Sequence, residues 1–365
     1  MNAFGMTMND IMTKWYEGLE KSRDLLKSTD VLLGPLDTEI AKTPYDVVYE
    51  EDRIKLKHYP ATSEKKVKTP LLIVYALINR ETMLDLQPGR SVVQNFMNMG
   101  VDVYMIDWGY PTRKDRYLTI DDHVNGYMDN VVDFICDRHG VPKINLMGIC
   151  MGGTFSIIYS ALHSEKIKNL ITTVAPSNFD TDQGLLHIWA REIDLGSVID
   201  AYGNMPGDLL NLGFLLLNPA RLVIDKYVSY FENMGNKDFI ENFVRMEKWI
   251  FDSPDVPGET IRQFMEDCYK KNLLIQSKME VGGRRVDLKN ITMPVLNIAQ
   301  YLWQIRPPRP AGGVRVAHKQ GGDPGHRGRL HRNRSHRNLR EFQISETIHA
   351  QDSRVAEAKR RRPRY

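Results

Sequence analysis

The chain is poor in cysteine and has no long apolar run. Its three cysteines, Cys136, Cys150 and Cys268, are too few and too widely spaced for a disulfide framework or a zinc site, so we expect a reducing, cytoplasmic setting and no bound metal. No stretch approaches the roughly 18 uninterrupted apolar residues that a membrane-spanning helix needs. Residues 1–22 contain neither the basic nor the apolar region of a secretory signal. A soluble globular protein with no transmembrane segment is therefore expected.

Basic and acidic residues are unevenly distributed along the 365 residues. Residues 301–365 hold 16 of the 49 Lys and Arg residues but only 5 of the 46 Asp and Glu residues. The net charge of this tail is therefore +11, and that of the rest of the chain is −8. A basic tail of this kind is typical of proteins that bind nucleic acid or an anionic surface.

Short apolar runs alternate with amphipathic segments over the first half of the chain, which predicts a parallel sheet covered by helices on both faces. The expected strands are 70–75, 101–106, 143–147 and 167–174, and the expected helices are 121–138 and 154–162. Residues 177–290 then read as mostly helical, and a strand-like run returns at 293–298. This order predicts an α/β-hydrolase fold with a helical cap inserted late in the sheet.

Five regions are expected from these patterns. An amphipathic helix near the N-terminus carries its apolar side chains on one stripe and is expected to pack on its own domain or, as a second reading, to dock on a partner. That helix spans 8–27, with Ile11, Trp15, Leu19 and Leu26 on the stripe. The expected boundaries are 1–30 for the N-terminal helix, 31–176 for the core, 177–290 for the cap, 291–298 for the returning core strand and 299–365 for a basic, disordered tail.

One short motif carries the chemistry. Gly148-Ile149-Cys150-Met151-Gly152-Gly153 follows an expected strand and precedes an expected helix, which is the setting of the G-x-S-x-G nucleophile elbow with cysteine in place of serine. The glycines Gly148, Gly152 and Gly153 allow the sharp turn, and the helix N-terminus favours the Cys150 thiolate. The alternative is a buried structural cysteine, the interpretation that we favour for Cys136 and Cys268.

An elbow of this kind needs donors for the oxyanion that forms on the attacked carbonyl. The backbone N–H of Met151 is the expected first donor, and a second is expected from the loop after the first parallel strand, at Ala76. A thiolate exchanges readily with a thioester, and the resulting acyl-enzyme stays reactive toward a hydroxyl, so cysteine suits acyl transfer from coenzyme A to a growing ester. The apolar cap is expected to exclude water, so that the acyl-enzyme extends rather than hydrolyses.

At this point residues 1–298 resemble the class III polyhydroxyalkanoate synthases, in the PhaC catalytic subunit. The residues that carry the resemblance are Gly148–Gly153, Val103–Pro111, Val74–Arg80 and Thr292–Ile298. The resemblance implies a cytoplasmic acyltransferase on polyester granules that works with a PhaE subunit, is homo-oligomeric, needs no cofactor and does not bind nucleic acid. It implies short-chain (R)-3-hydroxyacyl-CoA substrates, a nascent polyester chain and free CoA as by-product.

The resemblance also implies a histidine base, in a Gly-His-Ile-Gly motif near the C-terminus, and an aspartate after the strand at 294–298 that orients this base. Neither is found where the family pattern puts it. The five histidines of the tail receive no catalytic role. Four of the five histidines before it, His123, His139, His163 and His187, are expected to be surface or cap residues.

The tail beyond Ile298 has a composition typical of a GC-rich gene read out of frame, because Arg, Gly, Pro and His dominate 306–340. The segment 334–340, Arg-Ser-His-Arg-Asn-Leu-Arg, can be encoded by CGG TCA CAT CGG AAT CTA CGT. Without its first base this string reads GGT CAC ATC GGA ATC TAC GT, which encodes Gly-His-Ile-Gly-Ile-Tyr-Val. The same shift lets 306–308 encode the Val-Pro-Pro that follows the aspartate in the family, and 355–356 encode Trp-Leu.

We therefore infer a single-base frameshift within codons 299–306. Sequencing the gene across this stretch tests the inference, and an unbroken reading of the present frame would refute it. The alternative is a genuine basic tail that binds nucleic acid or the granule surface. Two other functions stay open for the chain: a thioesterase or lipase-like hydrolase of the same fold, and an inactive binding protein if the tail is genuine, since loss of the base and its orienting carboxylate costs orders of magnitude in rate.

Overall fold

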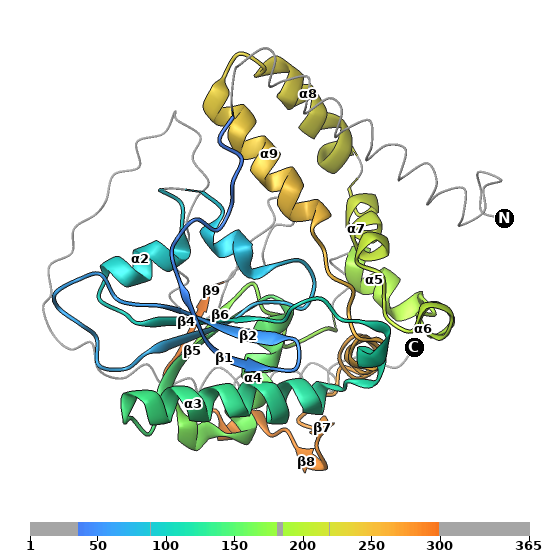
Figure 1. Ribbon diagram of the computed structural model, residues 1–365. Helices are drawn as coiled ribbons and strands as arrows, with labels where there is room; N and C mark the ends of the chain where they lie inside the picture. Colours follow the sequence, from blue (N-terminus) through green and yellow to red (C-terminus); the bar gives the residue numbers. More distant parts are fainter. Residues whose placement is uncertain (1–35, 88, 181–184, 219, 299–365) are drawn as a thin grey trace, which may run out of the picture.

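The computed structural model describes residues 36–298 except 88, 181–184 and 219 (Figure 1). The predicted helix at 8–27, the N-terminal region 1–30 and the tail 299–365 lie outside the described residues, so their predictions stay as they are. Within the described part of the chain, no helix combines the length and the apolar character that a bilayer crossing requires.

A seven-stranded sheet forms the centre of the molecule, in the order β1-β2-β4-β3-β5-β6-β9. The neighbours from β4 to β9 pair in parallel, whereas β1 and β2 form an antiparallel hairpin that joins the sheet through β4. The strands are β1 (Asp46–Glu51), β2 (Ile54–Tyr59), β3 (Leu71–Val74), β4 (Val103–Asp107), β5 (Ile144–Ile149), β6 (Ile167–Thr173) and β9 (Val295–Ile298). The five parallel strands are those predicted from the sequence, and the hairpin was not predicted.

Helices cover both faces of this sheet. The crossover from β3 to β4 runs toward one edge and those from β4 to β5 and β5 to β6 run toward the other, so right-handed connections place α2 on one face and α3 and α4 on the opposite face, as Figure 1 shows. The helices are α2 (Val92–Asn98), α3 (Asp129–His139) and α4 (Met151–Leu162), with short 3₁₀ turns at Glu81–Asp85, Arg113–Tyr117 and Ser164–Lys166. Strands β3 and β4 are buried along their whole length because both faces are covered.

The predicted helix at 121–138 differs from expectation at its start. Its first turns are π-helical over Asp122–Met128, and the regular helix α3 follows directly. Gly140 ends α3 in a left-handed conformation with φ +59°, as the sequence predicts for a C-terminal glycine.

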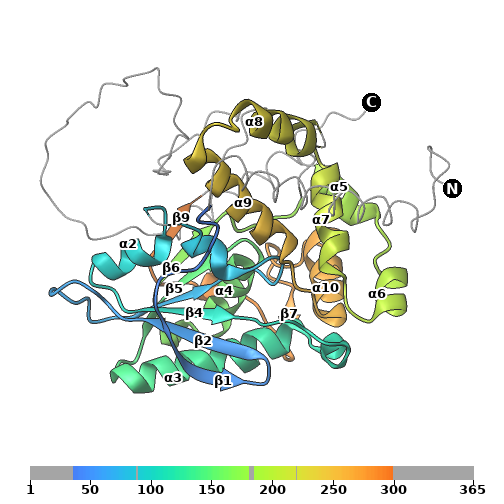
Figure 2. The ribbon, with the colours of Figure 1, turned by 45° about the horizontal axis from the view of Figure 1, so that its top comes forward.

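The segment between β6 and β9 is mainly helical. Most of its helices lie above and to the right of the sheet in Figures 1 and 2, whereas its short hairpin, labelled β7 and β8, lies at the bottom of Figure 1. Its elements are α5 (Leu185–Glu192), α6 (Gly196–Tyr202), α7 (Gly207–Leu216), a π-helical turn (Ala220–Asp225), α8 (Lys226–Glu232), α9 (Lys237–Phe251), α10 (Gly258–Gln263), a second π-helical turn (Phe264–Lys270), the short hairpin β7 (Glu280–Val281) and β8 (Arg284–Arg285), and a 3₁₀ turn (Leu288–Asn290). This segment has a small apolar core of its own between α8 and α9, formed by Tyr230, Ile240, Phe243 and Val244. The chain then returns to the sheet as β9.

Strand β9 is the last strand of the sheet in the described residues and differs from its buried neighbours. It pairs with β6 from Val295 to Ile298, and the Ile298 carbonyl accepts a hydrogen bond from the Val174 N–H at 2.8 Å. Yet Leu296 is 49% exposed, which is unusual for an apolar residue in a sheet with helices on both faces.

Candidate active site

Cys150 occupies a sharp turn between the end of β5 and the start of α4. Its backbone has φ +55° and ψ −126°, a conformation that residues other than glycine adopt only where the surrounding structure imposes it. The Cys150 N–H donates to the Thr173 carbonyl at the end of β6 at 3.0 Å. The Cys150 carbonyl accepts from the N–H groups of Gly153 and Thr154 at 2.9 and 3.2 Å. The turn is thus fixed on one side by the sheet and on the other by the helix.

The elbow glycines serve close packing, since the positive φ belongs to Cys150. A Cβ on Gly152 would lie 2.4 Å from the carbonyl oxygens of both Val74 and Tyr75. Only glycine therefore lets the first turn of α4 approach the end of β3. A Cβ on Gly148 would lie 2.4 Å from the Ser156 Oγ, and one on Gly153 would lie 2.3 Å from the Ala175 Cβ.

The pKa of the Cys150 thiol differs in direction from the sequence-based expectation. Solvent reaches the Cys150 side chain, but the protein atoms packed around it disfavour the thiolate, so that burial raises the pKa of Cys150. The Met151 N–H donates a hydrogen bond to the thiol and lowers this pKa in part. The net direction is opposite to the lowered pKa that a helix N-terminus predicts. Among the described residues, no charged side chain adds to the shift.

Two tyrosines lie close enough to Cys150 to feel its charge. Burial raises the pKa of Tyr75, at the end of β3, and a Cys150 thiolate raises it further. Tyr269 responds in the same way from the second π-helical turn of the insertion. The Tyr269 ring contacts those of Phe179, His187 and Phe264, with centroids 4.7, 5.4 and 5.9 Å apart. An aromatic wall from the insertion therefore borders the thiol.

Sequence reasoning missed Tyr269, and no local signal marks it, because only the folding of the insertion brings it to the elbow. The cap was expected to exclude water. In this structure solvent reaches Cys150, although protein atoms surround most of its thiol, and the exclusion of water from an acyl-enzyme stays a prediction.

The loop after β3 carries Ala76, the expected second oxyanion donor. Ala76 is 3% exposed, and its N–H has no hydrogen-bond acceptor among the residues that the structure describes. The preceding carbonyl, that of Tyr75, accepts a hydrogen bond from the indole N–H of Trp108 at 3.0 Å. Trp108 follows β4 directly and is buried. Trp108 lies within the segment 103–111 that carries the family resemblance, but its sequence position alone indicated no role, although the ends of neighbouring parallel strands meet at one edge of a sheet.

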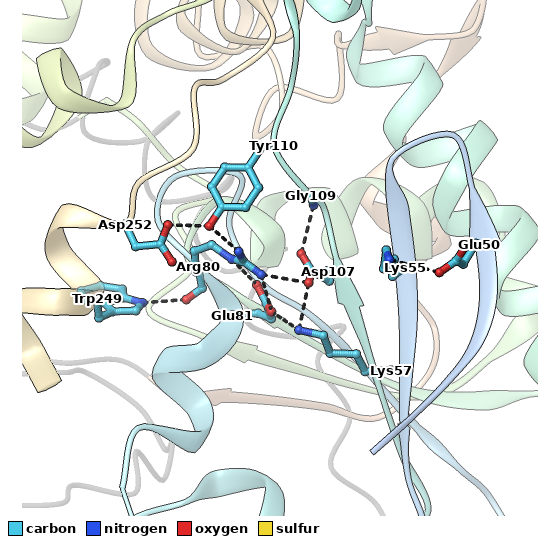
Figure 3. A network of polar contacts seen from close by, with 10 residues as sticks. All are labelled: Glu50, Lys55, Lys57, Arg80, Glu81, Asp107, Gly109, Tyr110, Trp249 and Asp252. Carbon is cyan, nitrogen blue, oxygen red and sulfur yellow. Dashed lines mark hydrogen bonds and ion pairs between the residues drawn. The ribbon is translucent and has the colours of Figure 1, made fainter. Parts of the chain in front are cut away.

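The far end of this loop is anchored by a buried network of charges, drawn in Figure 3. Lys57 on β2 contacts Glu81 and Asp107 at 2.5 and 2.9 Å. Arg80 contacts the same two carboxylates at 3.3 and 2.9 Å. Burial alone would raise the pKa of Asp107, but its contacts with Lys57 and Arg80 outweigh burial and hold this pKa below its usual value. Two cations and two carboxylates thus balance one another beneath the loop.

The insertion contacts the same end of the loop through α9 and the residues after it. The Trp249 indole donates to the Arg80 carbonyl at 2.7 Å, and the Arg80 guanidinium donates to the Tyr110 hydroxyl at 2.5 Å. Tyr110 in turn donates to Asp252 (Figure 3). The Ser253 hydroxyl donates to the side chain of Asn79, whose backbone has φ +62°.

One of the histidines in the described residues differs from expectation. His123 is fully buried and is not a surface or cap residue. Its Nδ1 lies 2.8 Å from the Thr119 carbonyl, its ring packs against Trp108, and burial lowers its pKa to about 4. His163 follows the last residue of α4 as its cap, and His139 is the last residue of α3. The described residues contain no group of His, Cys, Asp and Glu side chains that could hold a metal ion.

Comparison with known proteins agrees with this geometry. The family model of the alpha/beta hydrolase fold matches residues 69–299, and that of the poly-beta-hydroxybutyrate polymerase (PhaC) N-terminus matches residues 1–96. The chain is 46% identical over 294 residues to the poly(3-hydroxyalkanoate) polymerase subunit PhaC of Allochromatium vinosum, which covers 80% of this chain and 83% of the relative. The PhaC subunit of Synechocystis sp. is 46% identical (79% and 76% covered), and that of Thiocystis violacea is 45% identical (80% and 82% covered). The chain therefore belongs to the PhaC family of poly(3-hydroxyalkanoate) polymerase subunits and has the α/β-hydrolase fold.

Proposed function

We propose that this chain is an acyltransferase that polymerises short-chain (R)-3-hydroxyacyl-CoA, such as 3-hydroxybutyryl-CoA, into polyhydroxyalkanoate with release of CoA. Membership of the PhaC family supports the reaction class. The observation that carries the proposal is the backbone of Cys150, held at φ +55° between β5 and α4 with its thiol open to solvent. That is the arrangement of a nucleophile that must reach an external carbonyl.

In the first step the Cys150 thiolate attacks the carbonyl carbon of the acyl-CoA thioester. A carbon–sulfur bond forms to Cys150, and the carbonyl oxygen becomes an oxyanion that the N–H groups of Met151 and Ala76 stabilise. The intermediate then collapses, the bond to the CoA sulfur breaks, and CoA leaves as a thiolate that takes up a proton. The product is an acyl thioester on Cys150.

In the second step the hydroxyl of the next monomer attacks the acyl thioester. A histidine base takes the hydroxyl proton, an ester bond forms, and the bond to the Cys150 sulfur breaks. We propose that this histidine and the aspartate that orients it are encoded beyond Ile298 in the shifted frame. Two observations support this: the alpha/beta hydrolase family match ends at residue 299, and no charged side chain among the described residues contributes to the pKa shift of the Cys150 thiol.

We also propose a location and partners for the chain. It works in the cytoplasm as a homo-oligomer with a PhaE subunit, on the surface of polyester granules, without a cofactor and without nucleic acid. Co-production with a PhaE subunit, followed by size-exclusion chromatography and isolation of granules, tests the assembly. A chain that neither forms a complex with PhaE nor sediments with granules would contradict this part.

The nucleophile is tested by incubating the full chain with 3-hydroxybutyryl-CoA and identifying the acylated peptide by mass spectrometry. We expect one acyl group on Cys150 in the unsubstituted chain and none in Cys150→Ala. Cys136→Ala serves as a matched control, because Cys136 is a half-buried thiol on α3. Acylation that persists in Cys150→Ala would overturn the role of Cys150.

A second function, thioester hydrolysis, has one observation in its favour: solvent reaches the Cys150 thiol. Water could then take the place of the hydroxyl of the next monomer. Analysis of the products separates the two functions, because a hydrolase releases one free 3-hydroxybutyrate for each CoA, whereas a polymerase releases CoA and accumulates polyester.

A further inference from the structure

The Tyr75–Ala76 peptide links the end of β3 to the elbow. Its carbonyl accepts the hydrogen bond from the Trp108 indole at 3.0 Å. The same carbonyl oxygen lies against the backbone of Gly152, where a Cβ would approach it to 2.4 Å. The carbonyl side of this peptide is therefore held between a buried side chain and the first turn of α4.

The orientation of the carbonyl fixes that of the N–H. Every peptide bond in the described residues is trans, and a trans peptide is planar with its C=O and N–H directed to opposite sides. When Trp108 holds the Tyr75 carbonyl, it therefore also sets the direction of the Ala76 N–H. That N–H has no acceptor among the described residues, which leaves it available to a ligand oxygen.

We propose that Trp108 is a positioning residue of the acyl-transfer site. Its indole N–H holds the Tyr75–Ala76 peptide so that the Ala76 N–H meets the oxyanion formed during attack by Cys150. The inference rests on the proposed function, because it assigns a task to a donor of that reaction. Trp108 itself touches neither substrate nor thiol in this role.

The loop contains its own control. Trp249 also donates an indole N–H to a carbonyl of the loop, that of Arg80, at 2.7 Å (Figure 3). Both indoles thus hold one loop by the same kind of bond. Only the bond of Trp108 is made to the peptide that carries the Ala76 N–H. Loss of either bond would loosen the loop in general. Only loss of the Trp108 bond would also turn the Ala76 N–H away from the oxyanion.

The experiment measures two reactions of Cys150 in the full chain at one pH, by peptide mass spectrometry. Acylation by 3-hydroxybutyryl-CoA passes through an oxyanion, whereas alkylation by iodoacetamide displaces iodide and does not. Both reactions need the same thiolate, so the ratio of their rates cancels any change in thiol pKa. We expect Trp108→Phe to lower the ratio of acylation to alkylation by about tenfold or more, and Trp249→Phe to leave it unchanged.

An unchanged ratio in Trp108→Phe, or an equal fall in both variants, would overturn the inference. If Trp108→Phe does not fold, benzothienylalanine at position 108 removes the N–H and keeps the size of the ring, with the same expectations. Failure of the proposed function gives a different result. If the unsubstituted chain forms no acyl-Cys150, both the role of Cys150 as nucleophile and this inference are wrong. If it forms acyl-Cys150 and both Trp108 variants keep its ratio of acylation to alkylation, only the positioning role of Trp108 is wrong.

Discussion

Strands β5 and β9 end at the same edge of the parallel sheet, but their surroundings differ. Strand β5 lies between β3 and β6, and the turn after it is fixed by one hydrogen bond to β6 and by the contact of Gly152 with the end of β3. Strand β9 has one neighbour, β6, among the described residues, and its Leu296 is 49% exposed. The first strand end presents the thiol in a fixed turn, whereas the second is an open edge of the sheet.

This difference separates two halves of the proposed site. The proposed nucleophile and both proposed oxyanion donors depend only on strands and loops that pack within residues 46–298. The base and its orienting carboxylate are expected at and beyond the end of β9. Under the proposed function, residues 46–298 would supply the nucleophile and the oxyanion donors, whereas the base and its orienting carboxylate would depend on the reading frame of the tail.

The largest effect should come from restoring the frame. A one-base change within codons 299–306 would supply the Gly-His-Ile-Gly motif, and we expect release of CoA from 3-hydroxybutyryl-CoA to rise by about 10³-fold or more, since loss of a triad base costs at least that much. The rate is measured with a thiol reagent that detects free CoA. Cys150→Ala in the restored frame should abolish the gain. Equal activity of the two frames would contradict our account of the tail.

The second effect concerns the elbow side of the sheet. Asp107→Asn removes one of two buried carboxylates that balance Lys57 and Arg80, and we expect it to lower the free energy of unfolding by about 3–5 kcal/mol. Glu50→Gln is the control, because the Glu50–Lys55 pair in Figure 3 joins side chains that are 59% and 52% exposed. Loss of that pair should cost less than about 1 kcal/mol. Urea denaturation at pH 7 measures both values.

The loss of stability in Asp107→Asn depends on pH, and the direction of this dependence follows from the pKa of Asp107. The pKa of Asp107 is lowered in the folded state, so its contribution is fully present above the pKa of an unfolded aspartate, about 3.9. The contribution is lost as the pH falls through the folded-state pKa. The difference between the unsubstituted chain and Asp107→Asn should therefore shrink below about pH 4. A difference that stays constant to lower pH would contradict a contribution from the charge of Asp107.

The same contrast explains what the sequence could predict. The five parallel strands were predictable because burial on both faces gives continuous apolar runs such as Leu71–Val74. The β1–β2 hairpin was not, because Lys57 interrupts β2 and its burial depends on Glu81 and Asp107, which lie far along the chain. Local pattern does not reveal an ion pair of this kind.

The candidate site divides in the same way. Cys150 and its glycines were predictable because strand, turn and helix are contiguous in sequence. The contact of Trp108 with the Tyr75 carbonyl and the approach of Tyr269 join segments that meet only in the folded chain. The burial of His123 also depends on packing against Trp108 and Phe155, and its own segment does not indicate it.

The third effect compares one leucine on each strand. Leu146 on β5 is fully buried, and Leu146→Ala should lower the free energy of unfolding by about 2–5 kcal/mol. Leu296 on β9 is half exposed, and Leu296→Ala should cost less than about 1 kcal/mol in the present chain. In the frame-restored chain the cost at Leu296 should rise, because added structure would cover the edge of β9. Chemical denaturation measures all three. A large cost at Leu296 in the present chain would contradict the open edge.

The smallest effect is a shift in the pH profile of Cys150 alkylation. Burial raises the pKa of this thiol, so the thiolate forms only as the pH rises above the range of a free cysteine, about 8.5. In the present chain we expect the alkylation rate of the Cys150 peptide, followed with iodoacetamide, to reach half of its maximum above that pH. In the frame-restored chain a protonated histidine beside the thiol would stabilise the thiolate and move the midpoint to lower pH. Each unit by which the pKa falls raises the ratio of thiolate to thiol at a given pH by about tenfold. A midpoint near pH 7 in the present chain would mean that a cation already faces the thiol, and the proton-transfer half of the site would then be sought in the sequence as it stands.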